Sequence, residues 1–540
     1  MTERSSYNTA GANDRELGDF TMRWETLRLV PLALVIGVLS AVAALALLSL
    51  IAVITNLAYR LRFSAEFQPP TLAVLGAFTV VIPVIGGLII GLMARYGSEQ
   101  IRGHGIPEAM QTILVGGSKV KPRLTVLKPI SSAIAIGTGG PFGAEGPIIL
   151  TGGALGSVFA QFFKLSATER RSLLVAGAAA GMSAVFGTPI AAVVLGVELL
   201  VFEWRPRSLV LIALASAVAG AIRVGFAQAG LMDAAPLFST NVEIAPGTMM
   251  FLGAVVIGIV GGFAAWLVTK AVYAAEDAFS RLPIHWMWWP ALGGLVIGIG
   301  GLIEPTHRGV GYETIADELA GRLGVATLLS VFTVKLAIWA IGLGSGTSGG
   351  VLAPILIMGA AVGGLTAPFL PGGPLGAWAL LGMAAVLAGG LRSPLTAVIF
   401  AFELTYDTHL LLPLLLASML AYLVSVLLLK RSILTEKIAR RGFHVLCEYS
   451  VDPLEALFAR EVMSTDVVTV PPERSASSVY ADLEKPTLAR RQRLLPVLEG
   501  NRLVGAVPWN DILELAASGS LDSDETVADV MLTDLVGRLP

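Results

Sequence analysis

The stretch Gly143-Ala144-Glu145-Gly146-Pro147 decides how this sequence is interpreted. It places a carboxylate between glycines, just before a proline, in a segment with few other charges. Proline is favoured in the first turn of a helix, so we expect a helix to begin here. The N-terminus of a helix exposes unpaired N–H groups and the positive end of the helix dipole. Glu145 is therefore a candidate functional group beside a site that attracts anions.

Two further stretches share this arrangement of glycines before a proline. They are Gly103-His104-Gly105-Ile106-Pro107 and Gly349-Gly350-Val351-Leu352-Ala353-Pro354. Together the three helix N-termini predict an anion site that needs no full cationic charge. Weak binding of this kind suits a conduit, because the ion must also leave. The pattern therefore favours a transported anion over a cation.

The composition is that of a membrane protein. Of 540 residues, 55% are hydrophobic and 14% are charged, against about 25% charged in a soluble domain. Several apolar runs reach the ~20 residues that span a bilayer: Leu32–Leu57, Leu72–Leu92, Thr248–Thr269 and Leu410–Leu429. This hydropathy excludes a soluble enzyme, so we assign no catalytic residue. Because Cys447 is the only cysteine and the histidines are scattered, we assign no metal-binding residue either. The net charge of −2 gives no basis for a nucleic-acid partner.

Glu145 is the exceptional residue in these apolar segments. A carboxylate at membrane depth is costly and is a functional hypothesis by default. When ionised, Glu145 can take the anion's place beside the helix N–H groups, and when protonated it can leave. It would then act as a gate and as a proton acceptor. The alternative is an acid that caps a helix near the surface.

An internal duplication is the strongest long-range signal. Pro147 is followed by Gly152 and Gly156, and Pro354 is followed at the same offsets by Gly359 and Gly363. A second set of matched positions repeats in the same way: Gly177, Pro189 and Glu198 in the first half, and Gly382, Pro394 and Glu403 in the second. Short apolar segments interrupted by glycine and proline indicate broken helices. The repeat therefore predicts a transporter-like fold with its site between the halves.

Basic residues flank both ends of the apolar region, which is typical of the cytoplasmic side. Arg23 and Arg28 precede it, and Lys430, Arg431 and Lys437 follow it. We therefore expect both termini in the cytoplasm and an even number of crossings, in a multi-pass protein of the inner (plasma) membrane of the cell. The predicted parts are a cytoplasmic segment at 1–27, a transmembrane domain at 28–442 and a small cytoplasmic α/β region at 443–540.

These stretches resemble the CLC family of chloride channels and proton/chloride antiporters. The corresponding stretches of that family read GSGIP, GREGP and GGxFxP, and here GHGIP, GAEGP and GGVLAP follow in the same order. The segment Ser393–Thr405 resembles a later signature of the family. The resemblance implies an all-α, inverted-repeat bundle with broken helices, a homodimer with one pore per subunit, and Glu145 as the gate. It also implies a set of anion-binding residues: His104, Gly105, Ala144, Gly146, Val351, Leu352 and Leu434.

Four of these positions depart from the family pattern. His104 replaces a serine, and its imidazole N–H can still donate to an anion, or the ring can face the cytoplasmic vestibule. Ala144 replaces an arginine, Leu352 a phenylalanine, and Leu434 a tyrosine. Because a backbone N–H is independent of the side chain, the change at Leu352 matters little. The sequence leaves open which small anion is carried.

The family's exchangers carry an inner glutamate directly after the acid equivalent to Glu198, and here that residue is Leu199. We therefore favour a passive anion channel or a weakly coupled transporter, with a proton-coupled antiporter as the alternative. Glu198 recurs as Glu403, so a structural contact at a helix end is its expected role. A proton relay through water is the other interpretation.

The tail resembles a CBS domain. Val462–Ser464 and Leu495–Asp511 match the first copy, and Val527–Met531 looks like the start of an incomplete second copy. Paired CBS domains often bind adenine nucleotides, for which Asp511 is present but Pro508 replaces the usual hydroxyl residue. We expect no resident cofactor, with a nucleotide here as the less favoured alternative.

Overall fold

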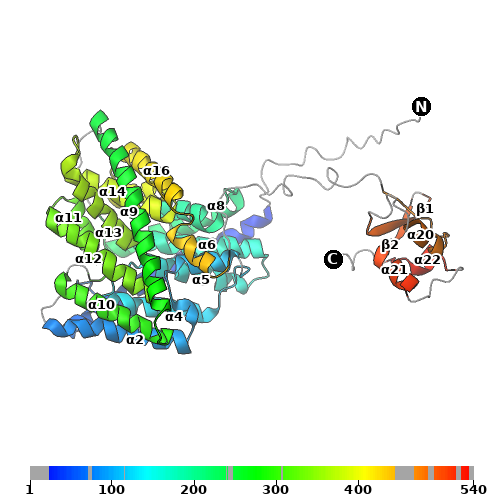
Figure 1. Ribbon diagram of the computed structural model, residues 1–540, viewed down its shortest axis with the longest axis horizontal. Coiled ribbons are helices and arrows are strands. Elements are labelled where there is room, and N and C mark those ends of the chain that lie inside the picture. The colour runs from blue at the N-terminus through cyan, green and yellow to red at the C-terminus, as the bar shows by residue number, and fades with distance from the viewer. Residues whose placement is uncertain are drawn as a thin grey trace. The chain divides into compact units, whose positions relative to one another are not determined.

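The computed structural model describes residues 24–70, 76–114, 116–238, 240, 247–305, 308–443, 467–483, 492–500, 502–517 and 525–533. The chain divides into two compact units, Met1–Tyr449 and Ser450–Pro540. The first unit is helical and the second is a small α/β unit (Figure 1). The predicted segment Val462–Ser464 lies outside the described residues.

The helical unit is a bundle of long and short helices (Figure 1). Its first half contains α1 (Leu29–Arg60), α2 (Val81–Tyr96), α3 (Ile106–Leu114), α4 (Pro122–Gly137), α5 (Glu145–Gln161), α6 (Ala167–Phe186), α7 (Pro189–Leu195) and α8 (Pro206–Gln228). Its second half contains α9 (Thr248–Ser280), α10 (Trp289–Ile303), α11 (Tyr312–Leu319), α12 (Val325–Gly344), α13 (Leu352–Thr366), α14 (Leu375–Leu391), α15 (Pro394–Thr405), α16 (Leu411–Leu428) and α17 (Ile433–Arg440).

Among the described residues, 8 helical segments are long and apolar enough to cross a bilayer. They are Thr26–Arg60, Gly76–Tyr96, Pro206–Gln228, Thr248–Ser280, Trp286–Ile303, Val325–Gly344, Leu352–Phe369 and Leu411–Arg440. Shorter helices such as α5 and α7 lie between them. A bilayer leaves no water for loose backbone groups, so such short helices are stable only when protein surrounds their ends. The predicted membrane fold with broken helices is confirmed.

The C-terminal unit is built on an antiparallel pair, β1 (Leu494–Glu499) and β2 (Arg502–Pro508). The unit also contains the helices α20 (Ala476–Leu483) and α21 (Trp509–Ala517), and an isolated bridge joins Val470 to Val497. Its core contains Val470, Val479, Leu495, Val497, Val507, Ile512 and Val527. Pro508 ends β2 and Asp511 lies in the first turn of α21. The expectation of no resident cofactor, with a nucleotide here as the less favoured alternative, stays a prediction.

The segment that resembles the start of a second copy packs onto this same unit. It forms the short helix α22 (Val527–Val530). The N–H of Val527 donates to the carbonyl of Arg474 at 2.8 Å, and Ala506 and Leu532 exchange hydrogen bonds of 3.1 and 2.9 Å. The bonds with Ala506 satisfy backbone groups of β2, and the bond to Arg474 joins the segment to the turn before α20. The segment therefore completes the fold of the first copy.

The two halves of the helical unit repeat one packing pattern. In the first half α5 packs on α6, and α1 packs on both α6 and α8. In the second half α13 packs on α14, and α9 packs on both α14 and α16. The halves meet directly where α7 packs on α15. The duplication seen in the sequence is therefore a structural repeat.

Glycines of the repeat mark the closest helix crossings. A Cβ added to Gly152 would lie 2.2 Å from the carbonyl oxygen of Gly177, and one added to Gly359 would lie 2.8 Å from that of Gly382. Because no side chain intervenes, α5 and α13 lie directly against the backbones of α6 and α14. The repeated glycines Gly152 and Gly359 therefore serve tight helix packing.

Glu198 and Glu403 tie the halves together by capping each other's helices. The Glu403 carboxylate accepts from the N–H groups of Ile190 and Ala191 at 3.0 and 2.7 Å, in the first turn of α7. The Glu198 carboxylate accepts from Leu395 and Thr396 N–H at 3.3 and 2.9 Å, in the first turn of α15. Carboxylates stabilise helix N-termini by hydrogen bonding and by the dipole. The predicted helix-end contact of Glu198 is confirmed.

Replacing Glu403 with Ala should leave two N–H groups of α7 without acceptors at the contact between the halves. We expect a loss of about 1–3 kcal/mol in unfolding free energy, which is the cost of unsatisfied buried donors. Thermal unfolding of purified protein in detergent measures it. Glu198→Ala should give a similar loss, whereas Glu66→Ala, at an exposed position of the loop after α1, should not. Equal stability of all four proteins would exclude the capping role.

Candidate anion site

The loops before α5 and α13 are joined backbone to backbone. Gly350 N–H donates to the carbonyl of Gly143 at 3.0 Å, and Gly143 N–H donates to that of Gly350 at 3.4 Å. Ala144 and Val351, two predicted anion-binding residues, are the caps that directly precede the two helices, and both are fully buried. The structure therefore brings two of the three predicted helix N-termini together, from opposite halves of the repeat.

The loop before α3 joins the loops before α5 and α13 at Gly146. A Cβ on Gly146 would lie 1.8 Å from the carbonyl oxygen of His104 and 3.2 Å from the Cα of Gly350. A Cβ on Gly105 would lie 2.2 Å from the carbonyl oxygen of Gly146, and Gly105 also has a φ of +92°. Only glycine tolerates both the contact and this conformation. The three glycine stretches thus meet around Gly146.

The Glu145 carboxylate lies in this junction and is fully buried. Its Oε1 accepts from the N–H of Ala353, in the first turn of α13, at 3.1 Å. Its Oε2 has no hydrogen-bond partner among the described residues. Added Cβ atoms on Gly143 and Gly350 would lie 1.6 and 2.7 Å from this oxygen. The carboxylate therefore occupies a helix N-terminus in a space that two glycines leave open.

The N-terminus of α3 has a carboxylate of its own. Glu108 Oε2 accepts from Gly105 N–H at 2.8 Å, so this amide is not free for an anion in this structure. Glu108 Oε1 accepts from Arg441 at 2.9 Å. The buried Lys128 donates to the carbonyls of Ile101 and Gly103 at 2.9 and 2.8 Å. The loop before α3 is thus held by charged side chains, unlike the loops before α5 and α13, which meet at Glu145.

Comparison with known proteins gives the family. The model of the voltage gated chloride channel family matches residues 86–426, and the CBS domain model matches residues 459–518. The ClcB-like protein of Ralstonia nicotianae is 30% identical over 360 residues, which cover 64% of this chain and 82% of that relative. The chain belongs to the voltage-gated chloride channel (CLC) family. It is a multi-pass membrane protein for the transport of small anions such as chloride, with a CBS domain after the CLC domain.

Other CLC proteins agree with this placement. The H(+)/Cl(-) exchange transporter ClcA of Salmonella arizonae is 29% identical over 418 residues, which cover 74% of this chain and 85% of that relative. The structure of a slow cyanobacterial Cl-/H+ antiporter superimposes with a TM-score of 0.68 at 24% identity, covering 78% of this chain and 99% of that chain. A CLC-type fluoride/proton antiporter gives 0.64 at 19% identity, covering 75% and 97%. These two structures support the inverted-repeat CLC fold.

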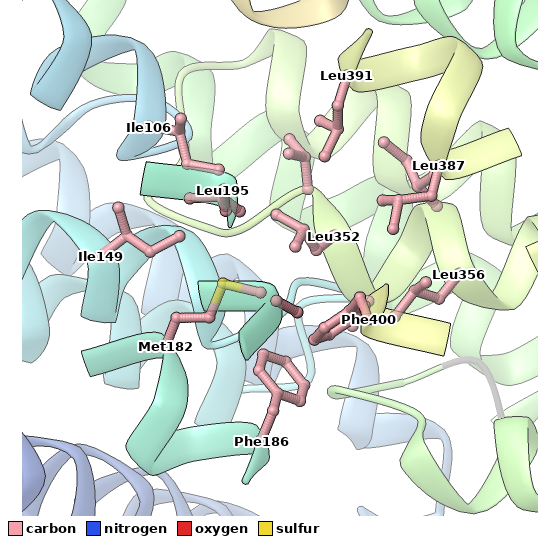
Figure 2. Close-up of a cluster of buried hydrophobic side chains, with 14 of the residues drawn as sticks. Ile106, Ile149, Met182, Phe186, Leu195, Leu352, Leu356, Leu387, Leu391 and Phe400 are labelled. Atoms are coloured by element: carbon pink, nitrogen blue, oxygen red, sulfur yellow. The ribbon is translucent and has the colours of Figure 1, made fainter. Parts of the chain in front are cut away.

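His104 and Leu352 differ in how they are placed. The His104 side chain is fully buried, and neither ring nitrogen has a hydrogen-bond partner among the described residues. The Leu352 side chain packs among buried apolar side chains such as Phe400 and Leu356 (Figure 2). Only the backbone of Leu352 can therefore serve an anion, whereas the imidazole of His104 retains an unused donor.

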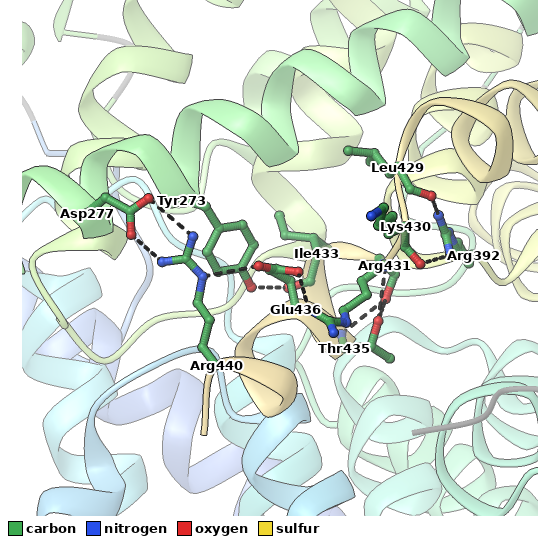
Figure 3. Close-up of polar contacts among 11 residues, drawn as sticks. Tyr273, Asp277, Arg392, Leu429, Lys430, Arg431, Ile433, Thr435, Glu436 and Arg440 are labelled. Atoms are coloured by element: carbon green, nitrogen blue, oxygen red, sulfur yellow. Dashed lines mark hydrogen bonds and ion pairs between the residues drawn. The ribbon is translucent and has the colours of Figure 1, made fainter. Parts of the chain in front are cut away.

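Leu434 lies in the apolar core at the start of α17 and offers no donor. The neighbouring hydroxyl group is that of Tyr273, which donates to the carbonyl of Ile433 at 2.5 Å (Figure 3). Arg440 on the same helix pairs with Asp277 and Glu436. These contacts anchor α17 to α9 and commit the Tyr273 hydroxyl to the backbone.

Sequence reasoning named Val351 and Leu352 but missed Ala353, whose N–H holds Glu145. The quoted stretch contained Ala353, but only the folded structure shows which amide faces a residue 208 positions away. It also missed Glu108 at the third position of α3, which the pattern of an acid in a first helical turn could have indicated.

Replacing Gly143 with Ala should expel the Glu145 carboxylate, because the new Cβ would lie 1.6 Å from Oε2. In buffer that contains gluconate and no halide, the N–H of Ala353 should then exchange with deuterium about tenfold faster or more, since a hydrogen bond to a charged acceptor is lost. Hydrogen exchange with mass spectrometry of α13 measures this. Gly225→Ala is the control, because nothing lies within 4 Å of the added Cβ. Unchanged protection in Gly143→Ala would refute the assigned packing.

Proposed function

We propose that this chain exchanges a small anion such as chloride for protons across the membrane. Its sequence alone favours a passive channel, because Leu199 stands where exchangers of the family carry an acid. The name of the Salmonella relative, a proton/chloride exchange transporter, instead favours coupling. The observation that carries the proposal is the Glu145 carboxylate on the Ala353 amide. At this amide the Glu145 carboxylate competes with the anion, and the same carboxylate can bind a proton.

The competition follows from the chemistry of the site. A helix N-terminus attracts any negative charge, so an anion and the ionised Glu145 bind the Ala353 amide in turn. Protonation removes the charge of the carboxyl group and weakens its hold on the amide. The anion then binds, and its departure follows when the carboxylate returns. Each time the anion and the Glu145 carboxylate replace one another at the amide, the transport of an anion is therefore coupled to the binding or release of a proton.

A passive channel is the second candidate. Leu199 is buried and has no group that titrates, and Glu198 is committed to the first turn of α15. An exchanger needs protons to reach Glu145 from the cytoplasmic side, and these two residues offer no free carboxylate there. If Glu145 exchanges its proton with one side only, the anion moves down its gradient under the control of pH.

His104 is the proposed side-chain donor for the anion. A buried imidazole with unused nitrogens can donate one N–H without adding charge. The backbone around Gly146 and Val351 would supply the other donors, and Leu434 would leave the ion without a hydroxyl contact. We also propose a homodimer with one pore per subunit and both termini in the cytoplasm.

Glu145→Gln should abolish proton movement and leave anion flux that no longer varies with pH, because an amide side chain cannot titrate. Purified protein in liposomes, with a chloride gradient imposed, allows chloride and proton fluxes to be measured with electrodes. In the parent protein we expect uphill proton movement. Parent protein that moves chloride without protons would instead support the channel.

The control is Glu66→Gln, an exposed carboxylate, which should match the parent in both fluxes. Proton transport that persists in Glu145→Gln would show that another group accepts the proton.

His104→Ala should weaken chloride binding about threefold to tenfold, the value of one neutral hydrogen bond. Isothermal titration of chloride into the purified protein measures the affinity, and a parallel flux series with chloride, bromide, nitrate and fluoride identifies the preferred anion. Leu434→Ala removes no polar group and serves as a control for altered packing. An affinity unchanged in His104→Ala would mean that the ring does not contact the anion.

A further inference from the structure

The hydroxyl group of Tyr312 is an unused polar group close to the Glu145 site. Tyr312 begins α11, and its hydroxyl oxygen is buried with no hydrogen-bond partner among the described residues. Oε2 of Glu145 is also buried and has no hydrogen-bond partner among the described residues. Buried polar groups are nearly always hydrogen-bonded, so each such exception calls for an explanation.

Aromatic contacts fix the ring of Tyr312 beside the start of α13. Its ring lies edge to face with Phe186, with centroids 6.0 Å apart, and Phe186 lies edge to face with Phe400 at 5.0 Å. The ring of Phe238 also lies edge to face with that of Tyr312, with centroids 6.4 Å apart. Figure 2 shows Phe186 and Phe400 together near Leu352, the residue before Ala353. The hydroxyl group is therefore held in place by the ring.

The phenol lies within electrostatic range of the Glu145 carboxylate and of Arg223 from α8. Two further charged groups surround the start of α11. Lys335 of α12 is buried, and its Nζ lies 2.7 Å from the position of a Cβ on Gly311. Glu318 of α11 is buried as well and interacts with Lys335. Among these groups, Glu145 is the acid whose side chain, in the proposed function, leaves the Ala353 amide.

Tyr312 also lines a cavity of about 270 Å³. Arg308, Glu313 and Asp317 contribute polar groups to this cavity, and Phe67 and Pro69 from the loop after α1 also line it. The start of α1 lies at the other end of that helix, where the Arg28 side chain donates a hydrogen bond to Glu169. The cavity therefore lies on the face opposite the start of α1, which is the outer face if the N-terminus is cytoplasmic.

We infer that the Tyr312 hydroxyl is the hydrogen-bond partner of the Glu145 carboxyl group when that group is protonated and has left the Ala353 amide. A backbone N–H only donates, so it suits the carboxylate. A phenol both donates and accepts, which matches the O–H and C=O of a neutral carboxylic acid. The inference rests on the proposed function. It assigns Tyr312 a positioning role and makes the adjoining cavity the route by which a proton reaches the gate.

Tyr312→Phe tests this role, because it removes the hydroxyl group and keeps the ring. Without its partner, the neutral form of Glu145 is less stable, so more acid is needed to open the site. We expect the pH of half-maximal chloride flux to fall by about 0.4 to 1 unit, which corresponds to one neutral hydrogen bond. The measurement is chloride efflux from liposomes, with the pH varied equally on both sides.

Two controls separate this effect from a change in packing. Tyr406→Phe removes the hydroxyl of an exposed tyrosine that also lies near Arg223, and it should leave the profile unchanged. In a Glu145→Gln background, Tyr312→Phe should cause no shift, because the titrating group is gone. Thermal unfolding of each variant establishes that it is folded.

A Tyr312→Phe profile that superimposes on the parent profile would overturn the inference, as would a shift that persists in the Glu145→Gln background. The proposed exchange is judged separately, by proton movement in the parent protein. If the parent moves chloride without protons, exchange fails, while the shift in the pH profile still decides the role of Tyr312.

Discussion

The structure depends on one constraint: an N–H group at a helix end inside a membrane protein needs an acceptor, and no lipid can supply one. In this chain a carboxylate accepts N–H groups at the start of four helices. Glu403 caps α7, Glu198 caps α15, Glu108 caps α3 and Glu145 lies on α13. The same interaction thus holds the fold together and creates the candidate site. A helix end that accepts a carboxylate accepts an inorganic anion for the same reasons.

What separates these four carboxylates is how firmly each one is held. Glu198 and Glu403 each accept at least two backbone bonds with both oxygens engaged. Glu108 adds the guanidinium of Arg441 to its amide. Within the described part of the chain, Glu145 accepts a bond from Ala353 at 3.1 Å, and its Oε2 has no hydrogen-bond partner. Its departure costs the least hydrogen bonding of the four, and no lysine or arginine of the described residues donates to it. This difference supports the proposal that Glu145 is the carboxylate that an anion replaces, whereas the other three act as helix caps.

Much of this could be predicted from the sequence, because the relevant signals are local or periodic. Glycines before a proline located the start of α5 at Glu145, and matched offsets in the two halves revealed the repeat that Gly152 and Gly359 build. The contacts between distant segments could not be predicted. Which amide faces Glu145 depends on how α5 and α13 meet, and Ala353 became visible only in the fold. Tyr312 carried no signal, because a tyrosine at the start of a short helix is unremarkable until its hydroxyl is seen to be buried.

The glycines explain why the site can be closely packed and still bind a negative group weakly. Backbone contact at Gly146, Gly143 and Gly350 brings the three loops so close together that no side chain fits between them. The amides are therefore fixed in advance and pay little ordering cost when a negative group arrives. Since no lysine or arginine donates to Glu145 among the described residues, the attraction comes from amides and partial charges alone. Such a site holds a negative group long enough to select it and releases it when a competitor of the same charge arrives. Exchange between a bound anion and a tethered carboxylate needs this balance, and a full positive charge at Gly146 would abolish it.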